Sequence, residues 1–253
     1  MSGRLAGKKA LITGGAQGLG LEFGRRFVAE GADVVLTDVQ GGKVKEAAEE
    51  IGAKAGLQHD VTSPEDWISV AARANATMNG ISVLIHNAGI GSFGCIETET
   101  LEGYRKVMAV DTDAVFMGTQ ACLPMLKDNQ PGSIVVISSV AGIKAQSSLL
   151  AYNTAKAAVA MMSKSIAVHC ARSGYNINCN SVHPVFTKTP ILEPMIAMRP
   201  TREEGEAALT KHIPMKRLGE PEEVASMVTY LSSDEARFVT GSAFTIDGGM
   251  TAQ

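Results

Sequence analysis

The sequence has 253 residues, of which 45% are hydrophobic, 5% are aromatic and 19% are charged. Its 23 lysines and arginines against 26 aspartates and glutamates give a formal net charge of −3, which argues against nucleic acid or an anionic membrane as a partner. The hydrophobic content suits a full core, and an α/β chain of this length commonly forms one domain.

Short apolar runs alternate with segments of helical periodicity along the chain. The expected strands are residues 9–13, 33–37, 57–59, 82–86, 133–138, 176–182 and 243–246. The expected helices are residues 18–30, 43–51, 64–78, 98–109, 112–128, 152–173 and 221–232. This alternation predicts an α/β fold in which one doubly wound parallel sheet of about seven strands has helices on both faces.

Residues 185–220 interrupt the alternation. They contain Pro190, Pro194, Pro200 and Pro214, which break the segment into short helical pieces. We therefore expect residues 1–253 to form a single domain, with 185–220 as an insertion that covers a substrate site.

The N-terminal basic residues are followed by only three apolar residues before Thr13, which is too short for a signal peptide. No stretch reaches the roughly 18 apolar residues of a membrane span. The four cysteines form no CxxC pair, which is typical of free thiols in a reducing compartment. A cytoplasmic protein without membrane contact is the expectation.

A glycine-rich loop, with Gly14, Gly18 and Gly20, follows the first expected strand and opens the first helix. Glycine permits a tight turn and lets backbone N–H groups approach a pyrophosphate, which a helix N-terminus attracts. Asp38 lies 18 residues after Gly20, where a carboxylate can bind ribose hydroxyls and repel a 2′-phosphate. Because no lysine or arginine occupies the loop or residues 37–40, the pattern favours NAD over NADP. An ordinary turn, with Asp38 as a polar strand end, is the alternative.

Tyr152 and Lys156 stand four residues apart on one helix face, and Ser139 lies 13 residues before Tyr152 at a strand end. Oxidising an alcohol requires a base for the hydroxyl proton while a hydride leaves for a nicotinamide. A free tyrosine titrates near pH 10, and a neighbouring ammonium favours the phenolate. Tyr152 is therefore the expected base, and Ser139 is expected to hydrogen-bond the substrate oxygen. A surface Tyr–Lys pair, or Ser138 in place of Ser139, are the alternatives.

The candidate residues share one position in the predicted fold, because each follows the carboxyl end of a strand. They are the glycine loop, Asp38, Asp60, Asn87, Ser139 and Pro184. Open α/β sheets bind ligands in the crevice beyond those ends. The placement therefore supports a common site.

The Gly-x3-Gly-x-Gly spacing, together with Ser139, Tyr152 and Lys156, resembles the short-chain dehydrogenase/reductase family, in particular its bacterial secondary-alcohol and hydroxysteroid dehydrogenases of about 250 residues. The similarity continues to Asp247-Gly248-Gly249 near the C-terminus. It implies a Rossmann-type fold, a homotetramer, and a nicotinamide ribose held by Lys156. The cofactor-binding residues that it implies are Gly14, Gln17, Gly18, Leu19, Gly20, Asp38, Asp60, Val61, Asn87, Ala88, Gly89, Tyr152, Lys156, Pro184, Thr187 and Thr189.

Three positions depart from the family pattern. Asp111 stands where an asparagine usually supports a proton relay to the lysine; we expect Asp111 to be the fourth catalytic residue and to add a negative charge near Lys156. Val185 replaces a glycine, so its loop either has an ordinary conformation or is rearranged. His86 replaces an asparagine and is interpreted as a hydrogen-bonding residue at a strand end, as His183 is interpreted as structural.

The expected substrate pocket is mainly apolar. Its predicted residues are Ser139, Ala145, Leu150, Tyr152, Val185, Phe186, Leu192 and Met195. A hydrophobic secondary alcohol or ketone, aliphatic, cyclic or steroidal, fits such a pocket. A 3-oxoacyl-thioester reductase and a catalytically silent dinucleotide-binding sensor or scaffold are the alternatives. The histidines form no metal-binding pattern, so no metal is expected.

Overall fold

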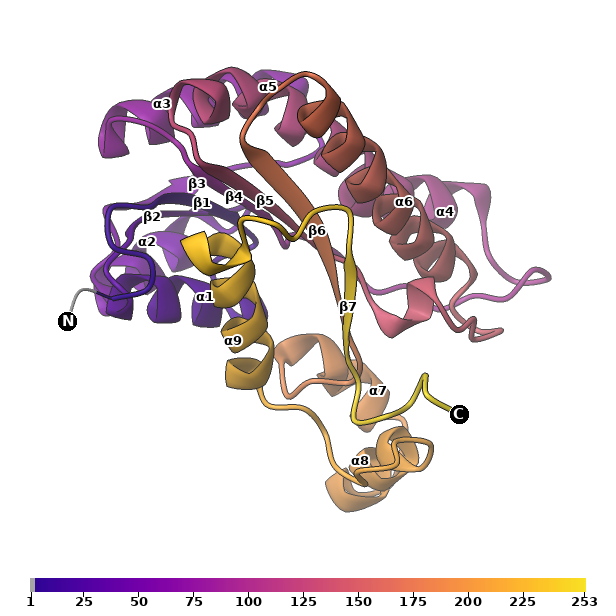
Figure 1. The fold of residues 1–253 in the computed structure, drawn as a ribbon. Coiled ribbons are helices and arrows are strands. Elements are labelled where there is room, and N and C mark those ends of the chain that lie inside the picture. The colour runs from indigo at the N-terminus through magenta and orange to yellow at the C-terminus, as the bar shows by residue number, and fades with distance from the viewer. Residues whose placement is uncertain (1–2) are drawn as a thin grey trace.

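The computed structural model describes residues 3–253 (Figure 1). Its strands form one parallel seven-stranded sheet in the order β3-β2-β1-β4-β5-β6-β7. The strands are β1 (Lys9–Thr13), β2 (Asp33–Asp38), β3 (Ala55–Gln58), β4 (Val83–His86), β5 (Gly132–Ile137), β6 (Ile177–Pro184) and β7 (Ala243–Ile246). The order turns back between β1 and β4, which is where doubly wound sheets open a crevice for ligands. The predicted fold class is therefore confirmed.

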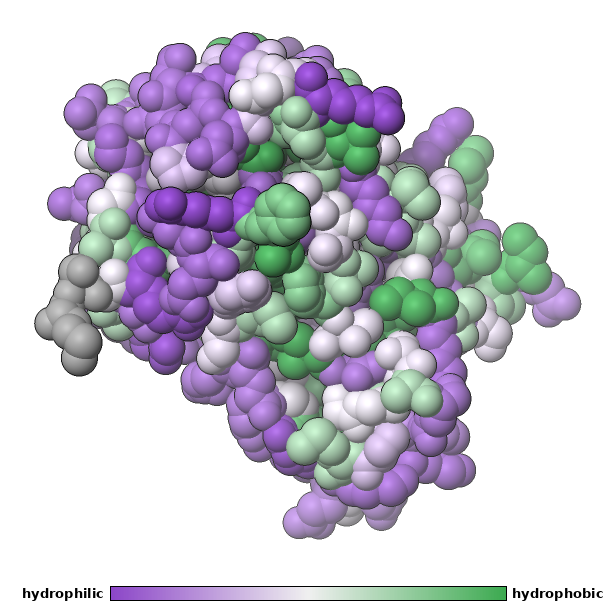
Figure 2. Space-filling view, viewed as in Figure 1, coloured by the Kyte–Doolittle hydropathy of each residue, from purple (hydrophilic) through white to green (hydrophobic). Residues whose placement is uncertain are grey.

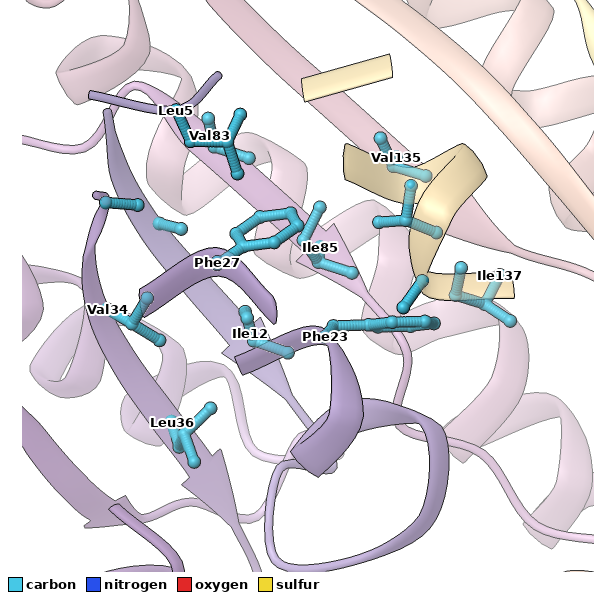
Figure 3. Close-up of a cluster of buried hydrophobic side chains, with 14 of the residues drawn as sticks. Leu5, Ile12, Phe23, Phe27, Val34, Leu36, Val83, Ile85, Val135 and Ile137 are labelled. Atoms are coloured by element: carbon cyan, nitrogen blue, oxygen red, sulfur yellow. The ribbon is translucent and has the colours of Figure 1, made fainter. Parts of the chain in front are cut away.

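Helices cover both faces of the sheet (Figure 1). They are α1 (Gly18–Ala29), α2 (Gly41–Ile51), α3 (Pro64–Met78), α4 (Leu101–Met108), α5 (Ala114–Asp128), α6 (Leu150–Arg172), α7 (Glu193–Ile196), α8 (Arg202–Thr210) and α9 (Pro221–Ser232). Side chains that alternate along each strand divide between two cores. On the face of α1, α2 and α9, Phe23 and Phe27 belong to one buried cluster with Ile12 and Leu36 (Figure 3). On the other face, α3, α5 and α6 bury Leu11 of the same strand.

Two details of the region before β5 differ from the sequence-based expectation. The helix expected from residue 98 begins at Leu101, because the Thr100 hydroxyl caps it by accepting the Gly103 N–H at 2.9 Å. The break expected between residues 109 and 112 is instead a π-helical turn, η1 (Ala109–Asp113), which joins α4 directly to α5. Such turns often lie at functional sites.

The segment after β6 carries α7 and α8 beyond the end of the sheet (Figure 1). It has a small core of its own, made of Leu192, Ile196 and Leu218. It corresponds to the insertion expected at 185–220, and its role as a lid stays a prediction. None of the helices between residues 3 and 253 is both long and apolar enough to cross a membrane.

Two buried histidines lie on either side of Trp67 beneath α3. The ring centroids of His59 and Trp67 are 4.3 Å apart, and those of Trp67 and His86 are 5.8 Å apart, both edge to face. The His59 ring bonds the Thr37 hydroxyl at 3.1 Å. Burial lowers the pKa of His59 to about 4 and that of His86 to about 3, so both are neutral near pH 7.

This histidine pair makes the stability of the fold sensitive to acid. In the unfolded chain each histidine titrates near 6.5, so the unfolded state binds more protons than the folded state below that pH. Between pH 6.5 and 5 the free energy of unfolding should fall by about 2 kcal/mol for each of the two histidines. Urea unfolding at a series of pH values tests this, with the His59→Asn variant expected to lose less stability over the same interval. An equal loss in both proteins would exclude His59 as a source.

Candidate active site

The glycine loop connects β1 to α1. Gly14 has φ of +65° and Gly18 has φ of +58°, which strongly favour glycine. A Cβ on Gly14 would lie 2.9 Å from the Ala88 Cα, so the loop passes close to the residues after β4. No side chain caps the N-terminus of α1 at Gln17, and its first turn carries no acidic residue. The amides of this turn, including those near Leu19, are therefore suited to bind an anion.

Asp38 ends β2 beside this loop. Its two carboxylate oxygens accept the Ala16 N–H at 3.2 Å and the Gln40 N–H at 3.0 Å. The carboxylate is thus held between the glycine loop and the start of α2, at the carboxyl edge of the sheet. This is the position that the sequence predicted for a ribose-binding group.

The segments after β3 and β4 are fixed at the same edge. The Asn87 side-chain amide donates to the carbonyls of Thr13 and Gly14 at 2.9 and 3.1 Å, and the Thr13 hydroxyl accepts the Ala88 N–H at 3.1 Å. The Asp60 carboxylate accepts the Thr62 hydroxyl and N–H, which lowers the pKa of Asp60. After it, the Val61 carbonyl accepts the Trp67 indole N–H at 2.9 Å.

Ser139 follows β5, Tyr152 and Lys156 lie in α6, and two hydrogen bonds hold the end of β5 to α6. The Ser138 hydroxyl is buried and donates to the Lys156 carbonyl at 2.7 Å, so Ser138 joins the two elements and does not face a substrate. The Ser139 hydroxyl accepts the Ala141 N–H at 3.1 Å and donates to the Pro184 carbonyl at 3.5 Å. The Lys156 ammonium donates to the Ile137 carbonyl at 3.1 Å and lies 5.5 Å from the centroid of the Tyr152 ring.

Asp111 joins this group from the π-helical turn. One carboxylate oxygen, Oδ2, forms a 3.0 Å ion pair with the Lys156 ammonium, and the other accepts the Ile90 N–H at 2.9 Å. Both charged side chains are almost fully buried. Burial is the largest single influence and would lower the pKa of Lys156, but Asp111 and Tyr152 together outweigh it, so the pKa of Lys156 is raised.

Two histidines occupy supporting positions. His183 bonds the Ser139 carbonyl through Nδ1 at 3.1 Å and the Ser181 hydroxyl through Nε2 at 2.9 Å. Burial lowers the pKa of His183. His86 bonds the Thr119 hydroxyl at 3.0 Å. Both arrangements agree with the structural roles expected for these residues.

The nicotinamide segment expected after β6 returns toward the glycine loop. The Thr187 hydroxyl donates to the Val185 carbonyl at 2.9 Å, and the Thr189 hydroxyl donates to the Thr187 carbonyl at 3.0 Å. A Cβ on Gly18 would lie 3.5 Å from the Thr189 Cβ. Val185 does not have a positive φ. Of the two conformations predicted for its loop, the structure therefore has the ordinary one.

The predicted substrate residues are only partly brought together. Leu150 and Tyr152 lie in the first turn of α6, and Ala145 is exposed on the loop before it. Leu192 is 5% exposed and belongs to the small core of the segment after β6, with Phe186 and Met195 packed against it. Leu192 therefore supports this segment more than it lines a pocket, which the apolar pattern of the sequence could not reveal.

Other contacts of the site were not expected from the sequence. The bond from Lys156 to the main-chain carbonyl of Ile137 could not be predicted, because a main-chain carbonyl leaves no trace in the pattern of side chains. The expected added charge near Lys156 was correct, but the direct contact between Asp111 and the ammonium was not foreseen. It becomes visible only once η1 places the carboxylate.

The fold and this site together define a dinucleotide-binding oxidoreductase, and comparisons with known proteins agree. A protein-family model described as "Enoyl-(Acyl carrier protein) reductase" matches residues 14–251. Among curated relatives, the NADP-dependent (R)-specific alcohol dehydrogenase of Lentilactobacillus kefiri is 38% identical over 257 residues, covering 100% of both chains. The 3-alpha-(or 20-beta)-hydroxysteroid dehydrogenase of Mycobacterium tuberculosis (strain ATCC 25618 / H37Rv) is 38% identical over 253 residues, covering 100% of this chain and 92% of the relative.

A third relative, the 2,5-dichloro-2,5-cyclohexadiene-1,4-diol dehydrogenase of Sphingobium indicum, is 38% identical over 256 residues, covering 98% of each chain. The chain belongs to the short-chain dehydrogenase/reductase family. It is therefore an oxidoreductase of a family that binds a nicotinamide dinucleotide.

Proposed function

We propose that this protein transfers a hydride between NAD(H) and a hydrophobic secondary alcohol or ketone. The observation that carries the proposal is the position of Ser139, Tyr152 and Lys156 at the sheet edge that also holds the glycine loop and Asp38. A merely structural role does not require a tyrosine, a buried ammonium and a serine hydroxyl to converge at a ligand-binding edge.

The residues at this edge fit a nicotinamide dinucleotide. The uncapped start of α1 suits the pyrophosphate, Asp38 the adenosine ribose, Asp60 and Val61 the adenine, and residues 184–189 the nicotinamide. When bound, the cofactor supplies the acceptor or donor of the hydride.

The protein side chains then handle the proton and the substrate oxygen. In oxidation, Tyr152 accepts the hydroxyl proton, and the Ser139 hydroxyl hydrogen-bonds the substrate oxygen. Lys156 has three N–H donors; one engages the Ile137 carbonyl, and the ammonium is also ion-paired with Asp111. The ammonium can still donate to a ribose hydroxyl, and Asp111 would join the proton relay behind it. In reduction the same groups act in reverse.

Asp38 is proposed to select NAD over NADP, although the name of the relative from L. kefiri specifies NADP. A carboxylate accepts hydrogen bonds from ribose hydroxyls and repels a 2′-phosphate. The Asp38→Ser variant should lower the ratio of kcat/KM with NAD to that with NADP by at least about tenfold, since a hydrogen bond to a charged group is worth about 1.5–3 kcal/mol and about 1.4 kcal/mol corresponds to tenfold. Asp33→Ser, at the opposite end of the same strand, is the matched control. An unchanged ratio in Asp38→Ser would remove Asp38 from cofactor selection.

An apolar surface near the site favours a hydrophobic substrate. In Figure 2, apolar side chains gather toward the right of the molecule, beside the loops near α4, whereas the left edge is mostly hydrophilic. Exposed apolar residues in the loops and the lid are Phe93, Ile96, Ile143, Ile191, Met198 and Met215. Lys188, a possible anion contact, is paired with Glu220. Aliphatic, cyclic and steroidal alcohols are therefore the first substrates to test.

A 3-oxoacyl-thioester reductase is the second candidate, favoured by the description of the matching family model. An absorbance assay at 340 nm separates the candidates, using NAD and NADP in turn with a panel of alcohols, their ketones and an acyl thioester. Turnover of alcohols with NAD supports the proposal, and turnover of the thioester alone supports the second candidate. Cofactor binding without turnover of any substrate would indicate a silent sensor or scaffold.

We also propose that the protein is a homotetramer in the cytoplasm. Phe116 on α5, with Met161 and Val168 on α6, is about half or more exposed, and such apolar residues favour association of helix faces. Light scattering after size-exclusion chromatography tests the oligomer.

A further inference from the structure

The serine of the candidate site is held by a side chain of the neighbouring strand. His183, near the end of β6, contacts the main-chain carbonyl of Ser139 through Nδ1 at 3.1 Å and the Ser181 hydroxyl through Nε2 at 2.9 Å. We propose that His183 is a positioning residue, whose Nδ1–H bond to the Ser139 carbonyl fixes the Ser139 hydroxyl where it meets the substrate oxygen. The proposal rests on the proposed function, which assigns that hydroxyl to the substrate.

The two partners of His183 decide which ring nitrogen carries the proton. A carbonyl oxygen can only accept a hydrogen bond, so Nδ1 must be the donor to Ser139. His183 is 1% exposed and burial lowers its pKa, so the ring is neutral near pH 7. In a neutral ring Nε2 is then the acceptor, and the Ser181 hydroxyl donates to it. Two directed hydrogen bonds therefore run from Ser181 through His183 to Ser139.

The bonds of Ser139 itself leave its hydroxyl available. The main-chain carbonyl also accepts the Gly142 N–H at 2.9 Å, so each lone pair of this oxygen has a donor. The hydroxyl accepts the Ala141 N–H at 3.1 Å, whereas its own donation to the Pro184 carbonyl is long, at 3.5 Å. A proton engaged at that distance is weakly held and can be given to a substrate oxygen. The main chain of Ser139 is thus fixed while its hydroxyl proton is not.

His183 acts where the pairing of β5 with β6 comes to its end. The Ser138 N–H still donates to the Val182 carbonyl at 2.8 Å, and one residue later the chain turns into the short helix Val140–Gly142. The imidazole extends the attachment to β6 by one residue, with a side chain in place of the main chain. Without the Nδ1 donor the Ser139 carbonyl would keep one donor instead of two, and the serine could turn away from the productive position.

Two substitutions of His183 separate the donor from the size of the side chain. Asparagine places its amide nitrogen close to the position of Nδ1, whereas glutamine places it close to that of Nε2. His183→Asn should keep most of the kcat with the best alcohol of the panel. His183→Gln should lose about tenfold or more in kcat, as expected for a misplaced catalytic group. The KM for NAD should stay near the wild-type value in both variants, because neither substitution removes a proposed cofactor contact.

The two amides are matched in chemistry, so each variant is the control for the other. Glutamine is the closer of the two to histidine in size, and a packing role would therefore favour His183→Gln. A kcat in His183→Gln that equals or exceeds that of His183→Asn would overturn the proposal. Melting temperatures of both variants show whether the comparison is made on folded protein.

Magnetic resonance of the histidine ring nitrogens in the unsubstituted protein decides the case in which the variants do not fold. The chain has five histidines, and Ser181→Ala identifies the signals of His183 because it removes the partner of Nε2. A ring protonated at Nδ1 supports the proposal. A ring protonated at Nε2 would overturn it, because Nδ1 could not then donate to Ser139. This measurement needs no substrate, so it still decides the role of His183 if no alcohol or ketone is turned over and the proposed function fails.

Discussion

Replacing Tyr152 by phenylalanine is expected to reduce alcohol oxidation by at least about 1,000-fold, within the range assigned to general acid–base catalysis. The variant lacks only the hydroxyl, so the proton of the substrate has no acceptor at the right position. The ring still packs in the first turns of α6, and the Lys156 ammonium keeps its bonds to the Ile137 carbonyl and Asp111. The fold and the affinity for NAD should therefore change little.

Three measurements separate this chemical effect from a structural one. They are kcat with the best alcohol of the panel, the melting temperature, and the affinity for NADH from its fluorescence. Tyr230→Phe, on α9 on the opposite side of the sheet, is the matched control and should retain activity. Substantial turnover by Tyr152→Phe would show that another group is the base, and the assigned mechanism would be wrong.

The Gly118→Ala variant is expected to lose much of the stability of the fold. A Cβ at this position in α5 would lie 2.4 Å from Trp67 and 2.7 Å from His86, both within ring systems that cannot bend away. The indole is 1% exposed and is held by its bond to the Val61 carbonyl. Relief requires α5 to move off the sheet or the indole to leave its place, so we expect a loss of about 3 kcal/mol or more in unfolding free energy.

Gly42→Ala is the matched control for this substitution. Gly42 lies in α2 with no atom within 4 Å of an added Cβ, so alanine should be neutral or stabilising by up to about 1 kcal/mol. The double variant Trp67→Leu/Gly118→Ala should lose less unfolding free energy than the sum of the losses in the two single variants, because the leucine leaves room for the methyl group. Additive losses in urea unfolding would mean that the clash is not the cause.

The sequence was sufficient to predict most of the fold and to predict that the candidate residues lie at one edge of the sheet. Period-two and apolar runs identify β1 to β7 because each strand is short, apolar and followed by a turn or a helix of clear period. The glycine loop and Asp38 are predictable because their chemistry depends on local order along the chain: strand, turn, helix, then strand end. The same holds for Tyr152 and Lys156, whose spacing alone places them on one helix face.

The features that sequence patterns missed depend on contacts between distant segments. The start of α4 is set by a cap at Thr100, and η1 is a backbone irregularity with no composition of its own. Leu192 is buried in the segment after β6 because Leu218, 26 residues further along the chain, completes the same small core. The pairing of Asp111 with Lys156 requires the register of two helices, which periodicity does not specify.

The separate core of the segment after β6 has a consequence for how this architecture can diversify. Leu192, Ile196 and Leu218 stabilise this segment internally, whereas the bond from Ser138 to the Lys156 carbonyl fixes α6 to the end of β5. The two parts thus have independent sources of rigidity. Under the proposed function, changes of length or composition in the segment after β6 can accumulate without disturbing Tyr152 and Lys156, so substrate choice can drift in descendants while the reaction itself is inherited intact.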